Sequence, residues 1–241
     1  ESKPHGKEGH GAMNELRLQS WRQFVEIADH LDVGPVVAQT YAFRGHSNAA
    51  WPLHPTLLRI LRRYSATEEK ALELERAALS EFRSQVHHHI SPSAFSVTTD
   101  TASWWTLMQH HGAPTRLLDW SASIYVAAYF AVIDDFDVDG AIWIVHTRSL
   151  HERMSECHGH TGFPKTESAI RSAFLQPNAP YVLMFAGRIS KTERMISQQG
   201  FFSICRSILG DHGQILADSL GEPNKKELLR KVIVPAELKM S

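Results

Sequence analysis

Apolar residues recur at helical spacing in the middle of the chain and stop at a sequence that cannot continue a helix. One helix face between residues 104 and 111 carries Trp104, Leu107, Met108 and His111. Gly112 follows where a left-handed C-cap is favoured, and Pro114 excludes a further helical turn. We therefore predict a helix that ends at about His111 and is followed by a tight turn.

The segment after this turn predicts a second helix. Residues 124–132 are apolar on every side, which is typical of a buried helix. Asp119 or Ser121 can serve as its N-cap, since their side chains accept hydrogen bonds from the free amides of a first turn. The positive end of this helix would attract anions and would lie beside four polar residues: Gln109, His110, Arg116 and Asp119.

Capping boxes predict two amphipathic helices in the first half of the chain. Ser20 and Gln23 precede an apolar stripe that ends before residue 32. Ser65 and Glu68 precede a longer stripe that runs to about residue 88. The other helical predictions are a short helix reaching Tyr64 and two short helices around a Gly-rich turn between residues 149 and 176.

β-branched and aromatic runs predict the strands. Residues 36–43 are bounded by Pro35 and Gly45, so Arg44 is expected at the C-terminal end of a strand. Further strands are expected at residues 141–146, 181–185, 200–205 and 228–234. Because helices gather in the N-terminal half and strands mainly in the C-terminal half, we predict an α+β fold with a mixed or antiparallel sheet.

The composition is that of a globular protein with one domain. The chain has 241 residues, of which 43% are hydrophobic, so it can bury a substantial core. Residues 1–13 are polar and Gly-rich, which predicts a disordered tail or a cloning remnant before a domain at residues 14–241. No apolar run could span a bilayer or act as a signal peptide, so we expect a cytoplasmic protein without a membrane partner.

Charge and metal-ligand spacing narrow the function classes. A net charge of −1 lacks the global basic excess of most nucleic-acid binders, although a local basic patch stays compatible with it. Two cysteines are too few for a disulfide scaffold. No metal site is expected, because no zinc motif has the spacing of the nearby ligand-type residues His151, Cys157, His158 and His160.

Two motifs, Phe43-Arg44-Gly45 and residues 109–121, resemble the FRG domain family, which is named for its Phe-Arg-Gly sequence. The resemblance spans about residues 40–205 and implies a module of bacterial, often mobile-element or defence-associated, proteins, including toxin systems. The family pattern continues beyond the last predicted strand, so a truncated C-terminus is one interpretation. Further matching positions are Trp51, Leu53, Pro55, Arg59, Arg194, Gln199, Gly200 and Phe202.

The order of these motifs is also similar to that of ADP-ribosyltransferases. This resemblance implies NAD as a substrate and an ADP-ribosyltransferase-like fold as one option. In those enzymes the late strand carries a glutamate that orients the nicotinamide ribose, whereas this chain has Gln199. An amide is a poor electrostatic partner for a developing oxocarbenium ion. Ordinary transferase activity is therefore expected only if Glu193 or Asp119 supplies the negative charge.

Polar residues inside the apolar motifs are the candidate site residues, because buried polar groups require partners. We expect one cleft to gather Arg44, Gln109, Arg116, Asp119 and Gln199. Arg44, with Gly45 beside it, would grip a pyrophosphate, since a guanidinium can bind two phosphate oxygens at once. The other expected roles are stacking on a planar ring by Trp51 or Trp120, ligand contacts from Gln109 and Arg116, and catalysis by His110, Asp119 and Gln199.

Each assignment has a structural alternative. Arg44 could pair with a carboxylate in the core, since an unpaired buried charge is unfavourable. Arg116 and Asp119 lie three residues apart and could pair with one another as a loop ion pair. Gln199 could tie down a neighbouring loop instead of a ligand hydroxyl.

The sequence supports two functions from different classes. The first is an effector whose cleft binds a phosphate-bearing nucleotide, with NAD as one candidate, and acts as an ADP-ribosyltransferase or glycohydrolase in bacterial defence or toxin systems. The second is a non-catalytic module that recognises nucleic acid or a partner protein. The second would depend on the basic cluster Arg59, Arg62 and Arg63.

Overall fold

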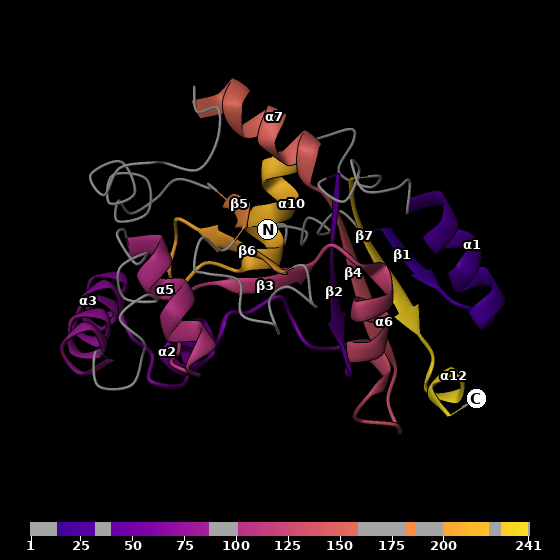
Figure 1. Cartoon of the computed structure of the whole chain (residues 1–241), viewed down its shortest axis with the longest axis horizontal. Coiled ribbons are helices and arrows are strands. Elements are labelled where there is room, and N and C mark those ends of the chain that lie inside the picture. The colour runs from indigo at the N-terminus through magenta and orange to yellow at the C-terminus, as the bar shows by residue number, and fades with distance from the viewer. Residues whose placement is uncertain are drawn as a thin grey trace, which may run out of the picture.

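A computed structural model describes residues 14–31, 40–86, 101–158, 182–186, 200–221 and 228–240, and Figure 1 shows their arrangement. One seven-stranded sheet organises them, in the order β1-β7-β4-β2-β3-β6-β5. Only β1 and β7 pair in parallel, and every other neighbouring pair is antiparallel. The sheet is therefore mixed, and the predicted α+β class is confirmed. The strands are β1 Asn14–Arg17, β2 Tyr41–His46, β3 Leu118–Ser121, β4 Gly140–His146, β5 Val182–Ala186, β6 Gly200–Cys205 and β7 Leu229–Val234.

Helices cover both faces of the sheet, because alternate residues of the central strands are apolar on both sides. In β4, Ile142 and Ile144 pack in one core cluster, whereas Trp143 and Val145 pack in the other. The first cluster includes residues of α1 (Trp21–Leu31) and α6 (Ile124–Val132). The second includes residues of α5 (Thr101–His110), α7 (Thr147–His158) and α10 (His212–Leu220). The prediction that residues 141–146 form a strand buried on both faces is confirmed.

The remaining helices lie at the two ends of the molecule. α2 (Thr56–Arg63) and α3 (Glu68–Gln85) lie at the opposite end from α1 and the short α12 (Ala236–Lys239) (Figure 1). α2 and α3 share a small apolar cluster around Leu61 and Ala71. A second small cluster joins the end of α3 to α5 through Trp104 and Leu107. These contacts hold α5 beside β3 and so position the central motif.

The predicted helix starts agree with the structure at α1 but not at α3. The amide of Gln23 donates to Ser20 Oγ at 3.2 Å, so Ser20 caps α1 as predicted. For α3 the predicted cap is wrong: Thr67 is the N-cap, and its side chain accepts from the Lys70 amide. Ser65 has a φ of 47°, which places it in a left-handed turn before the helix.

The prediction that Asp119 or Ser121 caps the second central helix is wrong. Residues 118–121 form β3, because Leu118 and Trp120 bury apolar side chains and the backbone pairs with β6 and β2. α6 begins later, at Ile124, with Ser123 as its N-cap residue. It is also not buried all round, since it exposes large side chains at Tyr125, Tyr129 and Phe130.

Arg44 lies within β2 and not at its C-terminal end. β2 continues to His46, and Arg44 is paired with Trp143 of β4. The part of the predicted strand at residues 36–39 lies outside the described residues, as do the predicted tail at residues 1–13 and the region 159–176. The strands at 200–205 and 228–234 are confirmed, the second starting at Leu229. Besides β3, three of the described elements were not predicted: β1, α10 and α12.

Candidate functional site

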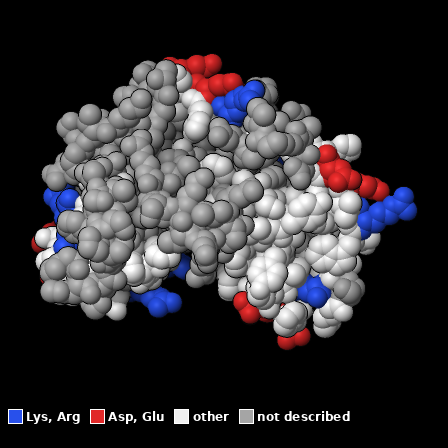
Figure 2. Space-filling model, in the orientation of Figure 1, with Lys and Arg blue, Asp and Glu red and all other residues white. Residues whose placement is uncertain are grey.

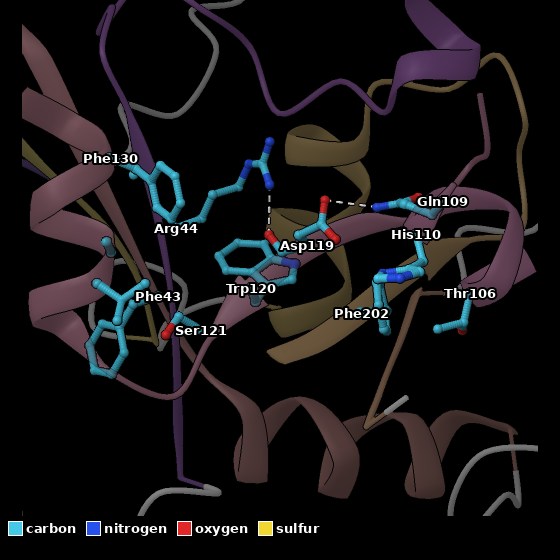
Figure 3. A pocket seen from close by; sticks show the side chains of 13 residues that line it. Phe43, Arg44, Thr106, Gln109, His110, Asp119, Trp120, Ser121, Phe130 and Phe202 are labelled. Carbon is cyan, nitrogen blue, oxygen red and sulfur yellow. Dashed lines mark hydrogen bonds between the residues drawn. The ribbon is translucent and has the colours of Figure 1, made fainter. Parts of the chain in front are cut away.

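The central motif and β2 form the wall of a cavity of about 380 Å³. Five elements or their ends contribute to its lining: β2, α5, β3, α6 and β6. Figure 3 shows the side chains of its lining residues. The cavity brings together six of the predicted site residues, namely Arg44, Gly45, Gln109, His110, Asp119 and Trp120.

Arg44 is held at the cavity wall by two hydrogen bonds to neutral groups. Its Nη1 donates to the backbone carbonyl oxygen of Asp119 at 2.7 Å, as drawn in Figure 3. Its Nε donates to Nε2 of His46 at 3.0 Å. Within the described part of the chain, no salt bridge joins Arg44 to a carboxylate, so its charge is positioned but not neutralised by direct contact.

The environment of Arg44 keeps His46 neutral. Burial, with a smaller contribution from the nearby Arg44 charge, lowers the pKa of His46 to about 3. Burial also lowers the pKa of Arg44, although an arginine stays charged at neutral pH. A neutral imidazole that accepts through Nε2 can therefore orient the guanidinium without repelling it. Alternation along β2 puts residues i and i+2 on one face, and this signal could have identified His46 from sequence.

Asp119 presents a carboxylate whose position is set by Gln109. Gln109 Nε2 donates to Asp119 Oδ2 at 2.7 Å. The amide oxygen of Gln109 accepts from the Thr115 hydroxyl, so the amide cannot rotate without breaking both bonds. Among the described residues, no hydrogen bond engages Asp119 Oδ1, and the side chain is exposed. Gln109 thus orients Asp119, and Asp119 keeps one oxygen available.

Trp120 lies beneath the cavity and is fixed by a buried hydrogen-bond chain. Its indole Nε1 donates to Ser203 Oγ at 2.7 Å, and Ser203 Oγ lies 2.8 Å from His212 Nε2. The serine oxygen accepts from the indole, so the serine hydroxyl is available to donate to a neutral His212. Burial lowers the pKa of His212 to about 3, so the imidazole is neutral at physiological pH. Nothing in the sequence pattern had indicated Ser203 or His212.

The buried His212 predicts that the free energy of unfolding decreases as the pH falls. The pKa of His212 is lowered from 6.5 to about 3, so between these values the unfolded chain binds the proton and the folded chain does not. The contribution of His212 to the free energy of unfolding is therefore fully present above the pKa of the unfolded chain and is lost as the pH falls below it. The expected loss is about 1 kcal/mol between about pH 7 and about pH 5.5. His212→Gln keeps a hydrogen-bond acceptor for Ser203 but cannot be protonated, so this variant should lose less stability between the two pH values. Urea unfolding at both pH values measures it, with the exposed His110→Gln as the control; an equal decline in both variants would contradict the assignment.

His110 and Gly45 also line the cavity, with different consequences. His110 ends α5 with an exposed side chain, so its imidazole is accessible for proton transfer.

Gly45 lines the cavity at a position where no side chain fits. A Cβ built on Gly45 would lie 1.9 Å from the Ala127 carbonyl oxygen and 2.8 Å from the Phe130 Cβ. The glycine therefore permits α6 to pack directly on β2.

Arg116 does not line the cavity. Its guanidinium forms a bidentate ion pair with the Glu75 carboxylate, in which the Nε to Oε1 distance is 2.6 Å, and both side chains are buried. The Arg116 side chain also lies over the Trp105 ring, 5.4 Å from its centroid. The predicted Arg116–Asp119 pair is therefore wrong, because Glu75 of α3 takes its place.

The other predicted residues lie elsewhere or outside the described chain. Trp51 lines a neighbouring cavity, whereas Gln199 and Glu193 lie outside the described residues. Of the metal-ligand cluster, only the position of His151 is described with its side chain. Within the described segments, no group of three His, Cys, Asp or Glu residues is placed to hold a metal ion. In the same segments, none of the helices has the length and apolar character needed to cross a membrane.

Comparison with known proteins identifies the segment that carries the cavity. No curated protein and no solved structure matches the chain. The likeness to ADP-ribosyltransferases therefore rests on the order of motifs alone. The model of the FRG domain matches residues 39–140, a range that includes Arg44, Gln109 and Asp119 but not Gln199. The chain therefore contains an FRG domain, and residues 39–140 are the part that the family model identifies.

Proposed function

We propose that the cavity binds a phosphate-bearing nucleotide, with NAD as the leading candidate, and that the protein is an ADP-ribosyltransferase or an NAD glycohydrolase. One observation carries the proposal: a positioned arginine and a positioned carboxylate lie on the same cavity wall. The cavity volume of about 380 Å³ falls in the range of roughly 300–1,000 Å³ that is usual for small-molecule sites. The defence or toxin role remains an inference from the family resemblance.

In this proposal Arg44 binds the phosphates. Its Nε and Nη1 are engaged by His46 and by the Asp119 carbonyl, so the guanidinium is held in one orientation before ligand arrives. Among the described residues, no hydrogen bond engages its Nη2. A preorganised guanidinium loses little side-chain entropy on binding, which favours phosphate recognition.

Asp119 and His110 supply the chemistry. Cleavage of the bond between the ribose C1′ and the nicotinamide nitrogen sends the bonding electrons to the pyridinium, which leaves as neutral nicotinamide. The ribose becomes an oxocarbenium-like cation, and the Asp119 carboxylate stabilises that positive charge. Water or an acceptor group then adds to C1′, and His110 accepts the proton that this nucleophile releases. Asp119 thus fulfils the role that Gln199 cannot fulfil electrostatically.

We expect Asp119→Asn to lower the turnover of NAD by about 100-fold, the typical effect of removing one electrostatic contact to a transition state. The asparagine oxygen can still accept from Gln109, so the variant removes charge and keeps the local geometry. Release of nicotinamide, followed by chromatography, measures the rate. Asp137→Asn is the control, because Asp137 is exposed and does not line either cavity. Equal rates in both variants would exclude Asp119 from catalysis.

We expect Arg44→Lys to fail to restore nucleotide binding. The ammonium keeps the charge but loses the planar fork, so affinity should fall by roughly 1.5–3 kcal/mol, as it should in Arg44→Ala. Calorimetric titration with NAD at two salt concentrations measures the loss, and Arg63→Lys serves as an exposed control. Wild-type affinity in Arg44→Lys would show that Arg44 supplies charge alone. Normal affinity with a lowered melting temperature in both Arg44 variants would instead make Arg44 a structural residue.

The alternative, a non-catalytic module for nucleic acid or a partner protein, has weaker support from the surface. On the face in Figure 2, the described Lys and Arg residues are scattered among Asp and Glu and form no continuous basic area. In the basic cluster of α2, Arg62 is engaged by His54 and by the Leu209 carbonyl. Binding of nucleic acid that persists in Arg44→Ala, without any consumption of NAD, would favour this alternative.

A further inference from the structure

A second cavity of about 650 Å³ adjoins the first. The two cavities share Arg44, Gly45 and Phe130 as lining residues. Arg44 therefore stands at their junction and faces both. A ligand that places a charged group at Arg44 can extend into either space, so the volume available to one molecule exceeds that of the first cavity.

The second cavity carries a further guanidinium. Arg59 of α2 lines the second cavity with an exposed side chain, and its Nη2 donates to Thr56 Oγ1 at 3.0 Å. Within the described residues, no salt bridge pairs Arg59 with a carboxylate. Its charge lowers the pKa of both Arg44 and His46, which is consistent with its proximity to them. Two such cations near one another repel in the empty cavity and favour a ligand with more than one negative charge.

The second cavity also presents an exposed aromatic ring. Trp51 is 47% exposed, and its indole meets the His46 ring edge-on, with centroids 6.2 Å apart. Trp120 in the first cavity is almost fully buried, so of these two indoles Trp51 is the more accessible to an entering ligand. An exposed indole beside two guanidinium groups suits a planar base that is joined to phosphates.

One part of the wall of the second cavity is acidic and fixed in place. Asp134 and Asp135 line it, and their backbone carbonyl oxygens accept from Lys239 Nζ at 3.2 and 3.0 Å. The same amino group donates to the Ser47 carbonyl at 2.5 Å. Carboxylates repel phosphate but accept hydrogen bonds from sugar hydroxyl groups, so this wall suits a ribose.

We infer that the ligand is a dinucleotide that spans both cavities, with its second base on Trp51 and its pyrophosphate between Arg44 and Arg59. This inference rests on the proposed function and assigns the parts of the substrate. The two linings together supply groups of three kinds: the aromatic side chains Trp51 and Trp120, the acidic residues Asp119, Asp134 and Asp135, and the basic residues Arg44 and Arg59. A dinucleotide has the matching parts: two bases, two riboses and the pyrophosphate that joins them. The leaving base lies by Asp119, and the retained base lies by Trp51.

Calorimetric titration of the full chain with NAD, ADP and nicotinamide mononucleotide tests this arrangement. Trp51→Ala and Arg59→Gln should each weaken the binding of NAD and ADP by about tenfold, the size expected for loss of one stacked base or one phosphate contact. Nicotinamide mononucleotide occupies the first cavity, so its affinity should stay within about twofold of the wild-type value. Matched controls are Tyr64→Ala and Arg63→Gln, because both residues are exposed and line neither cavity.

The outcomes separate this inference from the proposed function. If NAD is bound and cleaved but neither Trp51→Ala nor Arg59→Gln changes its affinity, the second cavity is not part of the site, although the proposed function stands. If ADP binds through Trp51 and Arg59 but no nicotinamide is released, the base site stands and the proposed catalysis fails. If none of the three nucleotides binds to the wild-type chain, both are overturned.

Discussion

Glu75→Ala should destabilise the protein by about 3–5 kcal/mol, the usual effect of removing one partner of a buried ion pair. The Glu75 and Arg116 side chains are only 5% and 3% exposed, and the pair joins α3 to the start of β3. Removal of the carboxylate would leave the Arg116 charge in the core without its ion-pair partner Glu75, although contacts such as those with the Trp105 ring and the Arg206 carbonyl would remain. Urea unfolding measures the loss in the free energy of unfolding.

Glu73→Ala is the matched control for Glu75→Ala. Glu73 lies on the same helix, is 68% exposed and pairs with Lys70, so its removal should change stability by less than about 0.5 kcal/mol. The double variant Glu75→Leu with Arg116→Met should be more stable than Glu75→Ala, since it leaves no unpaired charge in the core. A Glu75→Ala protein as stable as Glu73→Ala would show that the pair does not support the fold.

Gly45→Ala should destabilise the protein by at least about 3 kcal/mol, the upper end of the usual effect of overpacking a core. The added methyl group would lie 1.9 Å from the Ala127 carbonyl oxygen, which belongs to the backbone of α6. A backbone oxygen cannot move aside as a flexible side chain can, so α6 would have to shift away from β2. Thermal and urea unfolding of the purified variant measure the effect.

Gly200→Ala provides the comparison for Gly45→Ala. Gly200 also lies in a strand, but the nearest atom to its added Cβ would be the Trp120 carbonyl oxygen at 4.0 Å. This variant should therefore stay within about 1 kcal/mol of the wild type. Equal stabilities of Gly45→Ala and Gly200→Ala would show that α6 does not depend on the glycine. The result bears on the site as well, because α6 carries Phe130, which lines both cavities.

These two predictions assign structural roles to two motif residues that had been expected to contact a ligand. Arg116 is held by Glu75, which lies 41 residues away in the sequence. Gly45 does line the cavities, but its lack of a side chain is explained by the approach of α6. In the proposed function, Arg44, His110 and Asp119 keep their expected roles toward a ligand, with Gln109 as the residue that orients Asp119.

The sequence by itself determined the features that depend on neighbouring residues. The helix before Gly112 ends as predicted, and Gly112 has the left-handed φ of 80° that a helix C-terminus favours. Ser20 caps α1, and the apolar run at 140–146 is a strand buried on both faces. Caps, turns and side-chain alternation are local, so a few residues contain the information that decides them.

Only the tertiary structure decided which distant groups meet. Asp119 lies in a strand and not at a helix N-terminus, because β6 pairs with it from more than 80 positions away. The same pairing brings Ser203 and His212 beneath Trp120, although no spacing in the sequence relates them. The partner of a buried charge and the clearance around a glycine depend on how elements pack, and packing joins residues that local patterns cannot connect.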